Sequence, residues 1–106
     1  MSISSHVLDT SSGRPASGVR VTLERRDGDT WSSVTTAQTD SDGRVPSLAK
    51  DSPPATYRLR FDVADYFKGV ESFYPYVEIV FTIRSDEHHH VPLLISPFGY
   101  TTYRGS

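Results

Sequence analysis

The sequence contains no cysteine among its 106 residues. Disulfide bonds, thiolate nucleophiles and cysteine-ligated zinc are therefore excluded as sources of its stability or chemistry. The absence leaves the redox state of its compartment undetermined.

The sequence also lacks a large excess of charge of one sign and any long apolar run. Eleven Lys and Arg residues against thirteen Asp and Glu residues give a formal net charge of −2. The basic residues form no block that would bind a phosphate backbone, so nucleic acid is not an expected partner. No stretch approaches the roughly 20 apolar residues that span a bilayer, and residues 1–10 lack the basic and apolar regions of a secretion signal. We expect no membrane association and a cytoplasmic location.

Helical periodicity is almost absent, and alternation with a period of two takes its place. Residues 19–24, 57–61 and 77–83 each alternate apolar and polar side chains, and residues 89–95 add a further run. Each run has one face for a core, which predicts an all-β, two-sheet sandwich. The length predicts a single domain over residues 1–106, so an active site must be small or shared between subunits.

Turn residues separate these runs. Asp27-Gly28 and Asp42-Gly43 are typical of tight turns, because glycine adopts positive φ angles without steric cost. The segment 62–69 is the one candidate for a helix, with Asp62 as a possible N-cap and Gly69 as a stop. We expect one short helix there, of about two turns.

The four histidines, His6, His88, His89 and His90, are the side chains that titrate near neutral pH. On a strand His88 and His90 share one face, while His89 shares the other with the apolar Val91. The pair is compatible with a solvated polar surface, with a zinc site in which His6 is the third ligand, or with acid–base catalysis. Histidine spacing alone does not choose among these.

Arg44 follows the turn at Asp42-Gly43. Such a turn presents a guanidinium rigidly to a planar anion or a developing oxyanion, although a solvated arginine fits the same position. The turn is not a calcium loop of the EF-hand type, because Gln38 and Ala49 would occupy its first and last ligand positions.

Four separate segments carry a resemblance to a known family. They are SHVLDTSSGRPASGV at 5–19, TDSDGR at 39–44, HHHVPLLIS at 88–96 and YRGS at 103–106. In this order and spacing they resemble the transthyretin-like family, and within it the enzymes that hydrolyse 5-hydroxyisourate. The resemblance implies a transthyretin-type sandwich that forms a homotetramer, a dimer of dimers with catalytic pockets at a subunit interface.

The resemblance also implies functional positions. It assigns catalysis to four residues, His6, Arg44, His90 and Ser106, and substrate binding to four others, Tyr103, Arg104, Gly105 and His88. The YRGS tail, which otherwise reads as a frayed end, then belongs to the site. Arg104 either binds the polar edge of the substrate or ties the tail to the protein.

The implied reaction opens the lactam ring of 5-hydroxyisourate with water, giving 2-oxo-4-hydroxy-4-carboxy-5-ureidoimidazoline in urate degradation. We expect His6 and His90 to divide the base and acid roles and Arg44 to polarise the carbonyl. Ser106 positions the water or relays its proton, and a covalent seryl intermediate is the less favoured alternative. No metal or cofactor is expected.

Two other classes remain open at this point. A transthyretin-like carrier of a small aromatic ligand would share the fold without chemistry. A metal-binding or purely structural sandwich would use the histidines as ligands or as surface residues.

Overall fold

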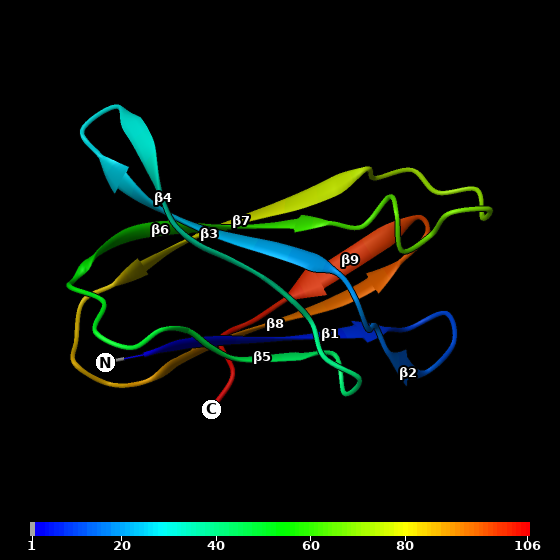
Figure 1. Cartoon of the computed structure of the whole chain (residues 1–106), viewed down its shortest axis with the longest axis horizontal. Helices are drawn as coiled ribbons and strands as arrows, with labels where there is room; N and C mark the ends of the chain where they lie inside the picture. The colour runs from blue at the N-terminus through cyan, green and yellow to red at the C-terminus, as the bar shows by residue number, and fades with distance from the viewer. Residues whose placement is uncertain (1) are drawn as a thin grey trace.

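The computed structural model describes residues 2–106, and the regular secondary structure of this part is entirely β (Figure 1). Its nine strands are β1 (Ile3–Asp9), β2 (Arg14–Pro15), β3 (Arg20–Asp27), β4 (Thr30–Gln38), β5 (Arg44–Ala49), β6 (Ala55–Asp62), β7 (Tyr76–Ile83), β8 (His89–Ser96) and β9 (Gly99–Thr102).

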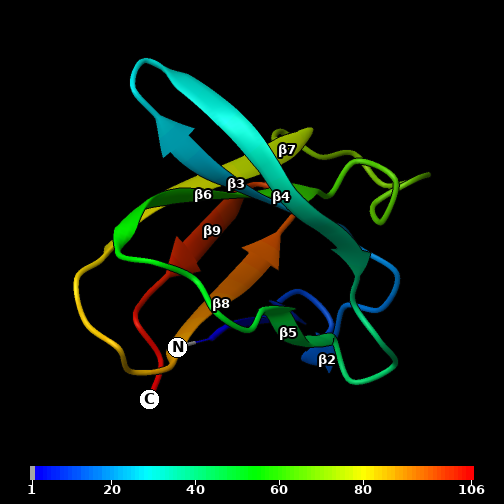
Figure 2. The same cartoon turned by 60° about the vertical axis from the view of Figure 1, so that its left-hand side comes forward.

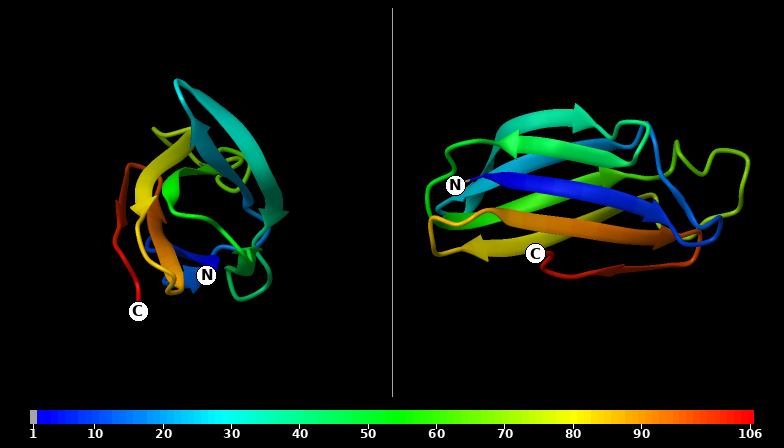
Figure 3. Two further views of the ribbon diagram at one scale, coloured as in Figure 1. Left: turned by 90° about the vertical axis from the view of Figure 1, so that its left-hand side faces the viewer. Right: turned by 90° about the horizontal axis from the view of Figure 1, so that it is seen from below.

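The strands form two sheets that face each other as layers (Figure 2). One sheet is antiparallel with the order β4-β3-β6-β7. The other has the order β2-β1-β8-β9, and β5 pairs with the same side of β1 as the short β2. Within residues 2–106, β1 and β8 run parallel, as Figure 3 shows, and the remaining strand pairings are antiparallel.

One hydrophobic cluster fills the space between the sheets. The alternating runs predicted from the sequence supply it, because Val21 and Leu23 of β3, Leu59 of β6 and Leu93 of β8 are completely buried. Burial of such side chains is the main driving force for folding. The predicted all-β, two-sheet sandwich is confirmed.

The predicted short helix is wrong. Residues 64–69 form successive turns with one bond of helical spacing, from the N–H of Phe67 to the carbonyl of Val63 at 3.1 Å. The next bonds span three residues, such as Val70 N–H to the carbonyl of Phe67 at 2.8 Å. A two-turn segment is too short to form a stable helix by itself. Here the burial of Val63 and Phe67 in the core decides its shape instead.

Within residues 2–106 no helix has the length and apolar character needed to cross a membrane.

Candidate active site

The outer face of the β1–β8 sheet collects side chains from three neighbouring strands. Ser4 and His6 occupy alternate positions on β1, on the face opposite to that of Ile3 and Val7, which belong to the core. Ser4 lies opposite His90 on β8, and His6 lies opposite Arg44 on β5. Strand pairing thus brings together residues that are up to 86 positions apart in the sequence.

His6 is held in a defined tautomer. Its Nε2 lies 2.9 Å from the carbonyl oxygen of Asp42, which can only accept a hydrogen bond. Nε2 therefore carries the proton, and in the neutral ring Nδ1 keeps its lone pair. His6 is thereby prepared to accept a proton at Nδ1.

A compact turn positions Arg44. The carboxylate of Asp40 accepts hydrogen bonds from the backbone N–H groups of Asp42 and Arg44, each at 2.9 Å. Gly43 between them has a φ of 73° and donates its N–H to the Asp40 carbonyl at 2.9 Å. No carboxylate among residues 2–106 lies within ion-pair distance of the Arg44 guanidinium. Its charge is available to an anionic ligand.

The C-terminal tail lies along β8 (Figure 3) and joins the site through Gly105. The N–H of Gly105 donates to the carbonyl of His90 at 2.8 Å. The backbone of Gly105 packs against the imidazole, since a Cβ atom there would lie 2.6 Å from Cδ2 of His90. The tail therefore packs against one side of the His90 ring, and a larger residue at position 105 would displace that ring.

A cleft of about 300 Å³ opens beside this contact. Its lining includes Ser4, Arg44, His88, His90 and Ser106. These are hydroxyl, imidazole and guanidinium groups, which suit a small polar ligand rather than an apolar one. His6 lies next to the cleft and is not among its lining residues.

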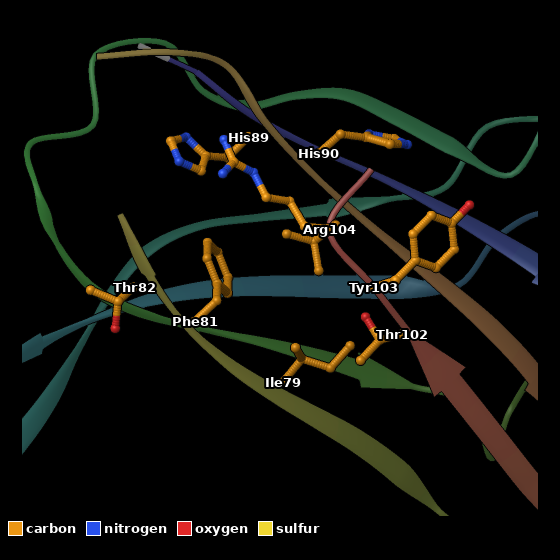
Figure 4. A pocket seen from close by; sticks show the side chains of 9 residues that line it. Ile79, Phe81, Thr82, His89, His90, Thr102, Tyr103 and Arg104 are labelled. Carbon is orange, nitrogen blue, oxygen red and sulfur yellow. The ribbon is translucent and has the colours of Figure 1, made fainter. Parts of the chain in front are cut away.

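Tyr103 and Arg104 lie on a different side of His90. They line a second hollow of about 270 Å³ together with β7 side chains such as Phe81, as Figure 4 shows. Arg104 donates a hydrogen bond from Nη2 to Glu87 Oε1 at 2.5 Å, and this ion pair holds the pKa of Glu87 below its usual value. Of the two roles considered for Arg104, the structure thus shows contacts that tie the tail to the protein.

The three consecutive histidines have different surroundings. His89 faces the core and is 7% exposed, and its Nδ1 has no hydrogen-bond partner in the described part of the chain. His88 contacts Ser2 and Ser4, and His90 contacts Ser4 through Nδ1 at 2.7 Å. The alternation predicted from the sequence separates them as expected.

The surroundings of His90 disfavour its charged form. Burial lowers the pKa of His90 below its ordinary value of 6.5, and the positive charges of His6, His88 and Arg44 lower it further. Each of these effects disfavours the imidazolium form. His90 is therefore mostly neutral near pH 7, as a proton acceptor requires.

No group of three His, Asp or Glu side chains among residues 2–106 has the geometry to hold a metal ion. The described residues thus do not form the zinc arrangement of His6, His88 and His90, and each of these rings instead has a serine or backbone hydrogen-bond partner.

Comparison with known proteins identifies the fold and the family. The family model described as HIUase/Transthyretin family matches residues 3–105. The chain belongs to this family. A 5-hydroxyisourate hydrolase (HIUase) from Mus musculus is 50% identical over 98% of this chain and 94% of its own length. The corresponding enzyme from Deinococcus radiodurans is 48% identical over 98% and 95%.

Solved structures in the family agree with the sheet arrangement. A 5-hydroxyisourate hydrolase from Klebsiella pneumoniae superposes with a TM-score of 0.89 at 36% identity, with full coverage of both chains. Transthyretin from Sparus aurata gives a TM-score of 0.91 at 30% identity over 97% and 95%. The HIUase/transthyretin fold is therefore shared by enzymes and by transthyretins.

Sequence reasoning missed several groups at this site. Ser2 and Ser4 carry no recognisable motif of their own, and serine is common on polar sheet faces. Glu87 as the partner of Arg104, and the Asp42 carbonyl as the partner of His6, depend on contacts across the fold. The alternation of β1 was the one available signal, since it places Ser4 on the same face as His6.

Proposed function

We propose that this chain hydrolyses 5-hydroxyisourate to 2-oxo-4-hydroxy-4-carboxy-5-ureidoimidazoline in urate degradation. The observation that carries the proposal is the polar cleft that brings Arg44, His90 and Ser106 together next to His6. It fits the activity named for the bacterial and animal relatives that cover nearly the whole chain.

The proposed mechanism uses one positive charge and two imidazoles. Arg44 polarises the carbonyl under attack and stabilises the oxyanion that forms there. Neutral imidazole nitrogens of His6 and His90 remove a proton from the attacking water and return one to the departing nitrogen. Ser106, which lines the cleft, orients the water.

The tail and His88 have supporting roles in the proposal. Gly105 presses on the His90 ring and fixes its plane. Tyr103 and Arg104 set the course of the tail, with Arg104 anchored on Glu87. His88 lines the cleft and contacts substrate at its edge.

We further propose that the active form is a homotetramer, a dimer of dimers, with the cleft at a subunit interface. The cleft lies on the outer surface of one sandwich, and the shared fold with transthyretins supports the assembly. A single hydrophobic cluster and a family match over residues 3–105 support one domain over residues 1–106. That domain assignment and the cytoplasmic location stay predictions.

A coupled ultraviolet assay tests the function. Urate oxidase generates 5-hydroxyisourate in situ, and the decay of the 5-hydroxyisourate absorbance is followed with and without the protein. We expect wild type to accelerate the decay and Arg44→Ala to lose about 10²–10³-fold in kcat. Arg14→Ala, which removes an exposed arginine from β2, is the matched control and keeps full activity.

A carrier is the second candidate, because one structural neighbour is a transthyretin from sea bream in complex with thyroxine, with a TM-score of 0.93 at 29% identity. The polar lining of the cleft disfavours it. Decay no faster than the spontaneous rate, together with thyroxine binding in calorimetry, would replace the hydrolase with the carrier.

A further inference from the structure

Two serines and two histidines form a continuous row along the outer edge of the cleft. Ser2 Oγ contacts His88 Nδ1, Ser4 Oγ lies 2.8 Å from His88 Nε2, and the same oxygen lies 2.7 Å from His90 Nδ1. Ser4 is 6% exposed, so its hydroxyl is largely screened from competing water. The row connects the partly exposed Ser2 to the imidazole inside the site.

The single proton of the Ser4 hydroxyl constrains both rings. A serine hydroxyl donates one hydrogen bond and accepts others. The hydroxyl of Ser4 is buried and has no other hydrogen-bond partner among the described residues, so it donates to one of the two ring nitrogens and accepts an N–H from the other. His88 Nε2 and His90 Nδ1 must then be in opposite states, one with a proton and one with a lone pair.

Two proton arrangements satisfy this condition when both rings are neutral. In the first, Ser4 donates to His88 Nε2, and His90 donates from Nδ1 to Ser4, so His90 Nε2 keeps a lone pair. In the second, all directions are reversed, and His90 carries its proton on Nε2. The lone pair on Nε2 suits a base, whereas the proton on Nε2 suits a hydrogen-bond donor.

Protonation of His88 selects between the arrangements. An imidazolium has a proton on both nitrogens, so a doubly protonated His88 must donate from Nε2 to Ser4. Ser4 then donates to His90 Nδ1, and neutral His90 is forced to carry its proton on Nε2. The state of His88 is thereby transmitted to the far side of the His90 ring.

We propose that Ser4 is a positioning residue that holds neutral His90 with its proton on Nδ1 and its Nε2 lone pair free, and that protonation of His88 reverses this tautomer through Ser4. The inference deepens the proposed function, because it rests on His90 acting as a proton acceptor in hydrolysis. The charges of His6 from β1 and Arg44 from β5 also disfavour the imidazolium form of His90. Tyr103 and Arg104 of the tail, and His89, line the hollow on another side of the ring. None of these groups makes a hydrogen bond to Nδ1 of His90, whose partner is Ser4.

Nitrogen-15 NMR of the imidazole rings tests the tautomer directly and without substrate. The His90 signals are assigned by their loss in His90→Gln. In wild type at a pH where both rings are neutral, we expect the proton on Nδ1 of His90, and its transfer to Nε2 as His88 is protonated. In Ser4→Ala we expect the position of the His90 proton to be independent of the protonation of His88. Ser4→Thr, which keeps the hydroxyl, should restore the dependence.

Ser5→Ala is the matched control. The Ser5 hydroxyl is on the opposite face of β1, buried, and donates to the Val91 carbonyl at 2.8 Å. Its removal also costs one hydrogen bond between β1 and β8 and leaves the histidine row intact. We expect Ser5→Ala to keep the wild-type tautomer and its dependence on His88.

Kinetics provides a second readout. We expect Ser4→Ala to lower kcat about tenfold or more, with KM changed by less than about twofold, because general base catalysis contributes 10²–10⁴-fold and water replaces the hydroxyl only in part. His88→Gln should change the pH profile of kcat in the wild-type background but not in the Ser4→Ala background. A double-mutant cycle of the two substitutions measures this difference.

The proposal is overturned if His90 in neutral wild type carries its proton on Nε2, or if Ser4→Ala keeps the wild-type coupling to His88. The wild-type spectrum decides this even if a variant fails to fold. A wild-type protein that does not accelerate substrate decay would overturn the proposed function, while the NMR spectra would still decide the tautomer.

Discussion

At the scale of single residues, Gly105 packs directly against the His90 ring. A Cβ atom at position 105 would lie 2.6 Å from His90 Cδ2. We expect Gly105→Ala to displace the imidazole and to lower kcat/KM by about 10²-fold, the cost of a misplacement of about 1 Å. The thermal midpoint should change little, because the tail contributes little to the core.

Gly99→Ala is the control for this substitution. Gly99 begins β9, has no unusual φ, and a Cβ atom there would meet only the Ser96 hydroxyl at 3.7 Å. We expect near wild-type kcat/KM. Equal activities of the two variants in the ultraviolet assay would show that the close packing on His90 has no catalytic role.

The protonation of His90 links the site to stability. Its pKa in the folded state lies below 6.5, so the unfolded chain binds more protons as the pH falls past that value. The stability contributed by neutral His90 is therefore present above pH 6.5 and is lost as the pH falls through its folded pKa. We expect urea unfolding between about pH 5 and 8 to show a smaller acid-side loss in His90→Gln than in wild type. An identical loss in both proteins would argue against the lowered pKa.

At the scale of elements, the turn before β5 carries the strongest backbone constraint. Gly43 has a φ of 73°, and a Cβ atom there would lie 2.4 Å from the Val7 carbonyl oxygen. Gly43→Ala combines an unfavourable φ, which costs about 1–2 kcal/mol, with a clash against β1. We expect a loss of more than about 2 kcal/mol in the free energy of unfolding, and loss of activity through the displaced Arg44.

Gly28→Ala separates the two contributions. Gly28 in the β3–β4 turn has a φ of 64°, and a Cβ atom added there would meet nothing within 4 Å. This variant should show the φ cost of about 1–2 kcal/mol alone. Equal unfolding free energies of the two variants in urea would contradict the clash with β1.

The strands were predictable because each run is amphipathic with a period of two, and a half-buried sheet requires that pattern. The segment 62–69 was not, because Asp62 and Gly69 satisfy helix-end rules while the core contacts of Val63 and Phe67 determine the backbone. Local rules describe the ends of an element, but tertiary packing decides whether a short element forms.

The site was predictable only in part for a similar reason. The resemblance of four sequence segments pointed to Arg44, His90 and Ser106, which the fold places around one cleft. Their physical connection was not readable, because it depends on parallel pairing of β1 with β8. Ser4 joins the site solely through that pairing.

At the scale of the whole molecule, the proposed tetramer makes a quantitative prediction. Light scattering after size exclusion should give four times the chain mass of 11.8 kDa. If the cleft is completed by a second subunit, specific activity should fall on dilution to concentrations at which the tetramer dissociates. A monomer with full activity at all concentrations would contradict the interface location.

The parallel pair of β1 and β8 also has a consequence for biosynthesis. The ribosome makes β1 first, yet its central neighbour in the sheet is the next-to-last strand to emerge. Until then the apolar side chains of Ile3 and Val7 lack the surface that buries them in the finished protein. Domains generally fold as units, and this sheet cannot be completed until nearly the whole domain has been synthesised. The side of β1 that pairs with β8 therefore stays open during synthesis, and chaperone demand should be greatest before residues 89–96 are released.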